Sequence, residues 1–175
     1  MPIVLARIDQ RIVHGQVASS PALEDFHVNG VIIADKALSE DAAQKLIFNA
    51  TLKASNVSLN LGIHYLTPEG VFSFLTEFDS PKARYLALFR DIKGALSAIN
   101  AGLKLTALNL GNYVSACQSK TALRNCFKVG PEELKELDIL SHQVSKLYFG
   151  SLDSMHNSSA LYKPASLSKS LTEGS

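Results

Sequence analysis

One histidine near the start of the chain is surrounded by residues that could bind an anion. Arg7, Asp9, Arg11, His14 and Gln16 lie within ten residues that are otherwise mainly apolar. Imidazole is a nucleophile near neutral pH, and arginine supplies fixed positive charge with several N–H donors. The cluster therefore predicts a site where His14 accepts and returns a phosphoryl group.

The same residues also have a purely structural interpretation. A lone histidine followed by glycine at the end of a strand is more often a loop residue with a satisfied hydrogen bond. An Arg-x-Asp pair is more often a surface ion pair of little energetic value. The density of the cluster favours the phosphoryl site, because several of its side chains would converge if the segment curled around an anion.

The place of the cluster along the chain supports the same prediction. An apolar run at residues 3–6 precedes it and is typical of a buried strand, which would give way to a loop and then a helix. A buried strand that ends in a tight loop directs backbone N–H groups and a helix N-terminus into one small space. His14 would sit inside that space.

Segments typical of strands and of helices alternate along the chain, which predicts an α/β fold. We expect a three-layer, open, mostly parallel twisted sheet of about six to seven strands with helices on both faces. The expected strands are residues 3–7, 30–35, 57–65, 85–89, 105–110, 126–129 and 146–149, and the expected helices are residues 39–54, 67–78, 91–100 and 131–141.

Several residues mark the expected ends of these helices. Ser39, Thr67 and Asp91 are good N-cap residues, and Gly102 suits the end of the helix that begins at Asp91. The helix after the histidine cluster is expected to be short, kinked or started late, because Pro21 would fall in its second turn.

The carboxyl ends of the strands are the expected place for a ligand, since open α/β sheets bind ligands there. Arg90, after the fourth strand, would add a cation, and Gly111, after the fifth, would let the backbone approach a ligand closely. Structural alternatives stay open: Arg90 could cap a surface, Asp35 could form a turn, and Gly111 could serve chain geometry. His64 is a rival to His14, but it has no flanking arginines.

Composition narrows the class of protein. A chain of 175 residues with 46% hydrophobic residues is expected to form one domain with a substantial core. We assign that domain to residues 1–150 and a Ser-rich C-terminal extension to residues 151–175. A net charge of +1 argues against a nucleic-acid-binding protein. The chain shows neither a signal-peptide pattern nor an apolar run that reaches the roughly 20 residues of a membrane span, which predicts a cytoplasmic protein.

The cysteines and histidines predict no metal site. Cys117 and Cys126 lack a C-x-x-C spacing and are expected to be free thiols in a reducing compartment. The five histidines are scattered singly along the chain, so no zinc-ligand pattern is present.

Residues 7–17, with the sequence Arg-Ile-Asp-Gln-Arg-Ile-Val-His-Gly-Gln-Val, resemble the N-terminal motif of a known family. This family is the IIB component of the mannose/fructose/sorbose family of the bacterial phosphoenolpyruvate-dependent sugar phosphotransferase system. Residues 31–35, 86–90 and 108–111 fall where that family has its second, fourth and fifth strand ends. The similarity covers roughly the first six-sevenths of the chain.

The resemblance implies a histidine phosphocarrier, a protein-Npi-phosphohistidine–sugar phosphotransferase. His14 would take the phosphoryl group from a IIA phosphodonor protein and pass it to a sugar bound by the membrane IIC/IID components. The protein would be cytoplasmic and peripherally associated with the inner face of the membrane through these partners. No cofactor, metal or nucleic acid is implied, and homo-oligomerisation stays open.

The resemblance also assigns roles to the residues of the cluster. Arg11, Arg7 and Arg90 would neutralise the phosphoryl oxygens, and main-chain N–H groups around Gly15 and Gln16 would donate to them. Asp9 would orient Arg11 or the second ring nitrogen of His14, because an anion next to phosphate would repel it.

Departures from the family pattern leave other functions open. The chain has no Trp, carries Ser20-Pro21 where relatives often have one, and continues Asn112-Tyr113 after Gly111. The alternatives are a non-catalytic sugar-phosphate-binding or regulatory paralogue and a phosphatase with a phosphohistidine intermediate. Tyr113 is expected either to form part of a docking rim or to fold into the core, and the sequence does not decide between the two.

Overall fold

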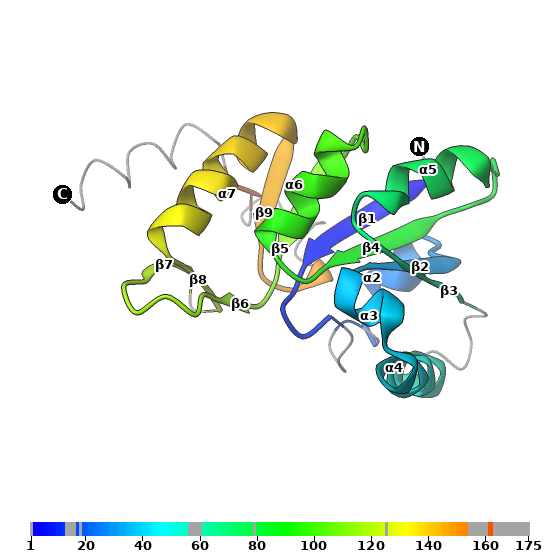
Figure 1. Cartoon of the computed structure of the whole chain (residues 1–175). Helices are drawn as coiled ribbons and strands as arrows, with labels where there is room; N and C mark the ends of the chain where they lie inside the picture. The colour runs from blue at the N-terminus through cyan, green and yellow to red at the C-terminus, as the bar shows by residue number, and fades with distance from the viewer. Residues whose placement is uncertain are drawn as a thin grey trace.

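The computed structural model describes residues 2–12, 17, 19–55, 61–78, 80–124, 126–153 and 161–162. The core of the fold is a seven-stranded sheet (Figure 1). Its strands are β1 (Ile3–Ile8), β2 (Gly30–Ala34), β3 (Gly62–Leu66), β4 (Tyr85–Phe89), β5 (Ala107–Leu110), β9 (Lys146–Phe149) and β10 (Leu161–Tyr162). Their order across the sheet is β10-β9-β5-β1-β4-β2-β3. All neighbouring pairs are parallel except β10 with β9, which confirms the predicted open, mostly parallel α/β sheet.

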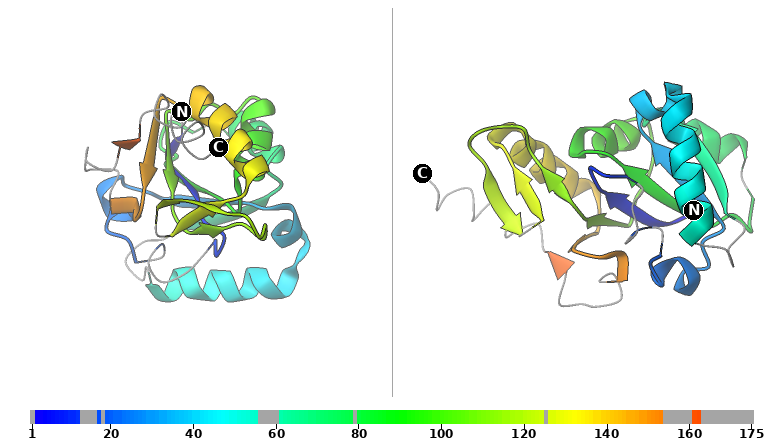
Figure 2. Two further views of the ribbon diagram at one scale, coloured as in Figure 1. Left: turned by 90° about the vertical axis from the view of Figure 1, so that its left-hand side faces the viewer. Right: turned by 90° about the horizontal axis from the view of Figure 1, so that it is seen from below.

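Helices cover both faces of this sheet, as Figures 1 and 2 show. One face carries α5 (Gly70–Glu77), α6 (Ile92–Asn100) and α7 (Pro131–Gln143). The other carries α2 (Ala22–Asp25), α3 (Lys36–Glu40) and α4 (Ala42–Ser55). The alternation along β1 accounts for the two layers: Ala6 and Ile8 face the α5–α7 side, whereas Leu5 faces the α2–α4 side.

The expected helix at residues 39–54 is in fact two helices, α3 and α4, separated at Asp41. Ser39 is therefore not an N-cap. The carboxylate of Asp35 caps α3 by accepting from the Leu38 N–H at 2.8 Å, and that of Asp41 accepts from the Gln44 N–H at 2.9 Å. The extended backbone at Asp41 (φ −94°, ψ 98°) interrupts the helix there.

Other element ends agree with the sequence more closely. Asp91 caps α6, because its carboxylate accepts from the Gly94 N–H at 2.7 Å. Gly102 follows α6 with φ +111°, a left-handed conformation that favours glycine. The helix α2 is only four residues long and begins directly after Pro21. The expected strand at residues 57–65 is described only from Leu61 on, and its strand pairing runs from Gly62 to Leu66.

A small second sheet lies between β5 and α7 in the chain. It consists of β6 (Tyr113–Val114), β8 (Phe127–Val129) and β7 (Thr121–Arg124), in that spatial order. The strand expected at residues 126–129 therefore exists, but it belongs to this small sheet rather than to the main one. Phe127 and Val129 are fully buried in the same core as α6 and α7, so the small sheet extends that face of the fold.

Candidate functional site

Arg7 lies near the carboxyl end of β1 and is buried, with 3% of its surface exposed. Its Nε and Nη2 donate to Oδ2 of Asp9 at 3.1 and 2.7 Å. Its Nη1 donates to the Gly150 carbonyl at 2.7 Å and to the side-chain oxygen of Asn109. The guanidinium is thus fixed by the residue that follows β1, by β5 and by the residue that follows β9.

Asp9 connects this buried arginine to the loop that precedes His14. The residue is fully buried, and its second oxygen, Oδ1, accepts from the backbone N–H of Arg11 at 3.1 Å. The Arg11 Nε lies 3.7 Å from the same oxygen, while half of the Arg11 side chain is exposed. A buried carboxylate is costly without a partner, so Arg7 and Asp9 stabilise each other and hold the start of the loop.

His14, Gly15 and Gln16 lie outside the described residues. The structure does place both flanks of this segment. Ile12 and Val17 are 0% and 1% exposed and belong to the core cluster on the α2–α4 face. The Gln10 N–H also donates to the Asn112 carbonyl at 2.7 Å, which ties the loop to the chain that follows β5.

Asn109 is a site residue that the sequence analysis did not identify. It is fully buried on β5; its oxygen accepts from Arg7, and its Nδ2 donates to the Ser151 carbonyl at 3.1 Å. A polar side chain inside an otherwise apolar strand was the available signal. The neighbouring Gly111 lies against the Arg7 guanidinium, so its close approach is to a side chain of the protein.

A cavity of about 460 Å³ opens beside these groups at the carboxyl edge of the sheet. Its side chains combine two arginines with several small polar groups. The lining residues are Arg7, Arg11, Ser19, Pro21, Gly111, Asn112, Cys126, Gly150, Ser151, Leu152 and Asp153. The cavity occupies the part of the fold where an open α/β sheet is expected to bind a ligand.

Asp153 closes one wall of this cavity. Its Oδ1 accepts from the Ser20 hydroxyl at 2.7 Å and from the Ala22 N–H at 3.2 Å. The chain after β9 therefore supplies a carboxylate to the start of α2. This contact joins two segments that are far apart in the sequence, and it holds the chain at Ser20 beside Pro21, which lines the cavity.

Arg90 and Asp35, which the sequence placed at the same edge, form an ion pair. The Arg90 Nε donates to Asp35, and its Nη1 donates to the Gln10 carbonyl at 3.3 Å. Both residues line a second cavity of about 380 Å³ beside α6, whereas the cavity around Arg7 does not include them. The Arg90 side chain thus contacts the backbone of the loop that follows β1.

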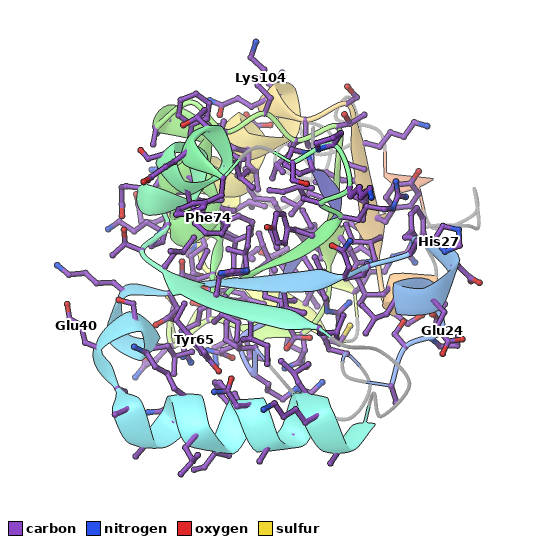
Figure 3. The ribbon with its side chains drawn as sticks, turned by 90° about the vertical axis from the view of Figure 1, so that its right-hand side faces the viewer. Glu24, His27, Glu40, Tyr65, Phe74 and Lys104 are labelled. Atoms are coloured by element: carbon purple, nitrogen blue, oxygen red, sulfur yellow. The ribbon has the colours of Figure 1, made fainter. Side chains whose placement is uncertain are left out.

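The structure argues against His64 as a rival. Its ring packs against those of Phe74 and Tyr85, with centroids 4.6 and 5.7 Å apart, and burial lowers the pKa of its imidazole. Figure 3 shows Phe74 above β3, and Tyr85 is the first residue of β4. His64 therefore faces the α5 side near the amino ends of the strands, away from the residues that line the Arg7 cavity.

Cys117 and Cys126 are free, and the Cys126 Sγ donates to the Gly111 carbonyl at 3.0 Å. Within the described ranges, no group of three or more His, Cys, Asp or Glu side chains is arranged to hold a metal ion. In the same part of the chain, no helix is long and apolar enough to cross a membrane.

Tyr113 belongs to the core rather than to an exposed rim. It is 7% exposed, its ring centroid lies 5.4 Å from that of Phe127, and its hydroxyl donates to Glu133 Oε1 at 2.6 Å. Burial and this bond to Glu133 raise the pKa of the Tyr113 phenol. Of the two interpretations left open by the sequence, the structural one agrees with the observed packing.

Comparison with known proteins identifies the family to which this fold and this N-terminal motif belong. The model of the PTS system sorbose subfamily IIB component matches residues 3–169, and the chain belongs to that family. This confirms the resemblance drawn from residues 7–17.

Individual relatives agree with the assignment. The chain is 27% identical over 138 residues to the mannose-specific EIIAB component of Escherichia coli K12, covering 77% of this chain but only 40% of that protein. It is 26% identical over 160 residues to the fructose-specific EIIB component of Bacillus subtilis, covering 88% of this chain and 90% of the relative. The solved structure of an N-acetyl-galactosamine IIB component from Streptococcus pyogenes has the same fold, with a TM-score of 0.74, 21% identity, and coverage of 94% and 96% of the two chains.

Proposed function

We propose that this protein is a histidine phosphocarrier of a sugar phosphotransferase system, with His14 as the residue that carries the phosphoryl group. The observation that carries the proposal is the buried pair of Arg7 and Asp9. Asp9 accepts from the backbone N–H of Arg11 at 3.1 Å and so anchors the chain three residues before His14. Family membership supports the same role.

The proposed chemistry is phosphoryl transfer between two histidines. A ring nitrogen of His14 attacks phosphorus on a phosphohistidine of the donor, a new P–N bond forms, and the donor's P–N bond breaks. Charge develops on the three equatorial oxygens, so the protein acts by positioning and electrostatic stabilisation. Arg11 supplies an exposed guanidinium for these oxygens, and backbone N–H groups at Gly15 and Gln16 donate to them.

Arg7, Asp9 and Arg90 act on the same phosphoryl group or on the loop. Arg7 faces the cavity next to Arg11 while Asp9 and Asn109 hold its position. Asp9 thereby orients both arginines without contacting phosphate. Arg90 adds positive charge at the same edge of the sheet and contacts the loop at Gln10.

We further propose that a IIA protein donates the phosphoryl group and that membrane IIC/IID components deliver the sugar that receives it. The protein would then work in the cytoplasm, bound to the inner face of the membrane through these partners. The energy of transfer resides in the donor's P–N bond, so the proposed step uses neither nucleotide nor metal. Homologous proteins are named for mannose, fructose and N-acetyl-galactosamine, and the membrane components would select among such sugars.

Phosphorylation by the upstream proteins tests the assignment directly. The chain is incubated with phosphoenolpyruvate, the general phosphotransferase proteins and a IIA protein, and its mass and acid-labile phosphate are measured. We expect one added phosphate, and we expect His14→Ala to abolish it. His142→Ala is the matched control, because His142 is an exposed histidine on α7.

Four outcomes would overturn the proposal or change the site. Normal labelling of His14→Ala, or loss of labelling in His64→Ala with His14 intact, would show that His14 is not the residue that carries the phosphoryl group. Tight binding of a sugar phosphate without any covalent phosphate would favour a non-catalytic paralogue. Rapid release of inorganic phosphate without an acceptor sugar would favour a phosphatase.

A further inference from the structure

The helix α4 turns an apolar face to solvent. Leu46 and Ile47, near its middle, are 71% and 61% exposed, the largest values among the exposed large hydrophobic side chains of the described residues. Ala43, Ala50 and Ala54 are exposed on the same helix. Spacings of three and four residues place these five side chains on one side of α4, and we call them the outer face.

The inner face of α4 is already occupied by the protein's own core. Leu52 is 1% exposed, and Phe48 packs against the same core cluster. The Tyr65 hydroxyl on β3 donates to the Lys45 carbonyl at 3.1 Å and to the Asn49 side chain at 2.9 Å. Figure 3 shows α4 lying below β3, with side chains on its far side pointing away from the sheet. A helix that is apolar on both sides is normally covered on both sides.

We propose that the outer face is the contact surface of a homodimer in which the α4 helices of two copies pack antiparallel. Charge favours a second copy in this orientation. Glu40 and Asp41 stand at the amino end of α4, and the exposed Lys53 stands near its carboxyl end. Antiparallel packing about a two-fold axis brings each Lys53 next to the acidic end of the other copy and opposes the two helix dipoles.

Side-chain sizes are also self-complementary in this arrangement. A two-fold axis that crosses α4 between Phe48 and Asn49 sets Ile47 opposite Ala50 of the second copy. The same axis sets Ala43 opposite Ala54. A large side chain therefore faces a small one at the centre, and two small ones let the helices approach closely at the ends.

The size of the outer face sets the strength of the dimer. The 14 residues of α4 span about 21 Å at a rise of about 1.5 Å per residue. One helix face of that length is smaller than the roughly 800 Å² per partner of a stable protein complex. The dimer is therefore weak and concentration-dependent. None of the described residues that line the cavity around Arg7 lies on α4, so dimerisation leaves that cavity open.

Analytical ultracentrifugation of the full chain over a wide concentration range tests the proposal. We expect a reversible monomer–dimer equilibrium whose dissociation constant rises about tenfold or more in the double variant Leu46→Glu/Ile47→Glu. Ile139→Glu is the matched control, because Ile139 is 52% exposed on α7 and should leave the equilibrium unchanged. Circular dichroism melting curves establish that each variant is folded.

Cysteine cross-linking tests the orientation of the two helices. In a Cys117→Ser/Cys126→Ser background, chains with Ala43→Cys are mixed with chains that carry Ala54→Cys and are then mildly oxidised. Antiparallel packing predicts disulfides between the two variants and few between two copies of either variant alone. Parallel packing predicts the reverse.

The proposal fails if the wild-type chain stays monomeric at every concentration, or if the double variant dimerises as strongly as the wild type. Preferential disulfides between two copies of Ala43→Cys would also overturn it. These outcomes are independent of His14 phosphorylation, so failure here leaves the proposed function untouched.

Discussion

Gly111 lies so close to the guanidinium of Arg7 that a Cβ on this glycine would be 2.2 Å from the Arg7 Cζ and from its Nη2. The contact joins the end of β5 to the end of β1, two strands that are neighbours in the sheet. Arg7 can therefore occupy its observed position only because residue 111 has no side chain. The same guanidinium is then held by Asp9 and Asn109.

We predict that Gly111→Ala displaces Arg7, because neither the backbone nor the buried guanidinium has room for the new methyl group. The free energy of unfolding should fall by about 1–3 kcal/mol, the usual cost of overpacking, and phosphoryl transfer should slow. Gly70→Ala is the control, since its Cβ would meet only the Thr67 Oγ1 at 3.2 Å. Urea unfolding and labelling kinetics equal to wild type in Gly111→Ala would contradict this account.

Asp9→Asn should be the most destabilising conservative change at the site. It removes the negative charge opposite Arg7 and leaves a buried cation without compensation, at an expected cost of about 3–5 kcal/mol. Glu132→Gln is the control for loss of one carboxylate charge. Glu132 pairs with Lys135 at 3.0 Å on the surface, so its loss should cost less than about 1 kcal/mol. Similar unfolding midpoints for the two variants would show that the burial of the Arg7–Asp9 pair has no energetic weight.

The fold follows from local patterns wherever an apolar segment has clear ends. The strand expected at residues 85–89 has those bounds in the structure, because Arg84 and Arg90 flank a continuous apolar run. The break between α3 and α4 was not predicted. Ser39 and Asp41 are both good capping residues in sequence, and Asp35 takes the first cap while also accepting from Arg90, 55 residues away.

Part of the candidate site could likewise be predicted from the sequence, and part could not. Arg7, Asp9 and Arg11 are close in sequence, so their convergence was predictable from the motif alone. Asn109 was not, because its contact with Arg7 spans 102 residues and depends on β5 lying next to β1. These strands are the fifth and the first along the chain. They are neighbours only because of the order in which the strands lie in the sheet.

We predict that Arg11→Lys slows phosphoryl transfer by about tenfold or more while the fold is unchanged. Lysine keeps the positive charge but loses the planar fork that matches phosphoryl oxygens. The bond from Arg11 to Asp9 uses the backbone N–H, so it survives the substitution. Arg84→Lys, at the amino end of β4, is the control for an arginine remote from the cavity. A transfer rate close to wild type in rapid-quench experiments would mean that Arg11 is only a surface charge.

Tyr113→Ala should lower stability without impairing transfer. Removal of a buried aromatic ring costs about 3–5 kcal/mol, and Tyr113→Phe, which loses only the bond to Glu133, should cost about 1 kcal/mol. Val114→Ala is the control, because Val114 is the next residue and is 39% exposed. Thermal unfolding and transfer rate per folded molecule are measured together. Slow transfer by a fully stable Tyr113→Ala protein would instead indicate that Tyr113 belongs to a docking surface.

The carboxyl group of Glu133 is expected to make the free energy of unfolding depend on pH in the acidic range. Burial acts to raise the pKa of its carboxyl, but hydrogen bonds from Ser115, Tyr113 and the Gly130 N–H outweigh it and lower the pKa below the ordinary 4.5. The unfolded chain then binds this proton at higher pH than the folded one. The contribution of Glu133 is therefore complete above about pH 4.5 and is lost as the pH falls through the lower folded pKa.

We accordingly expect Glu133→Gln to weaken the dependence of unfolding free energy on pH below pH 4.5, measured by urea titrations at a series of acidic pH values. Tyr113→Phe removes one of the bonds that lower the pKa, so its slope should lie between those of wild type and Glu133→Gln. Val114→Ala should retain the wild-type slope. If Glu133→Gln is as sensitive to acid as the wild type, then other carboxylates govern the acid response, and the bonds to Glu133 stabilise the two protonation states equally.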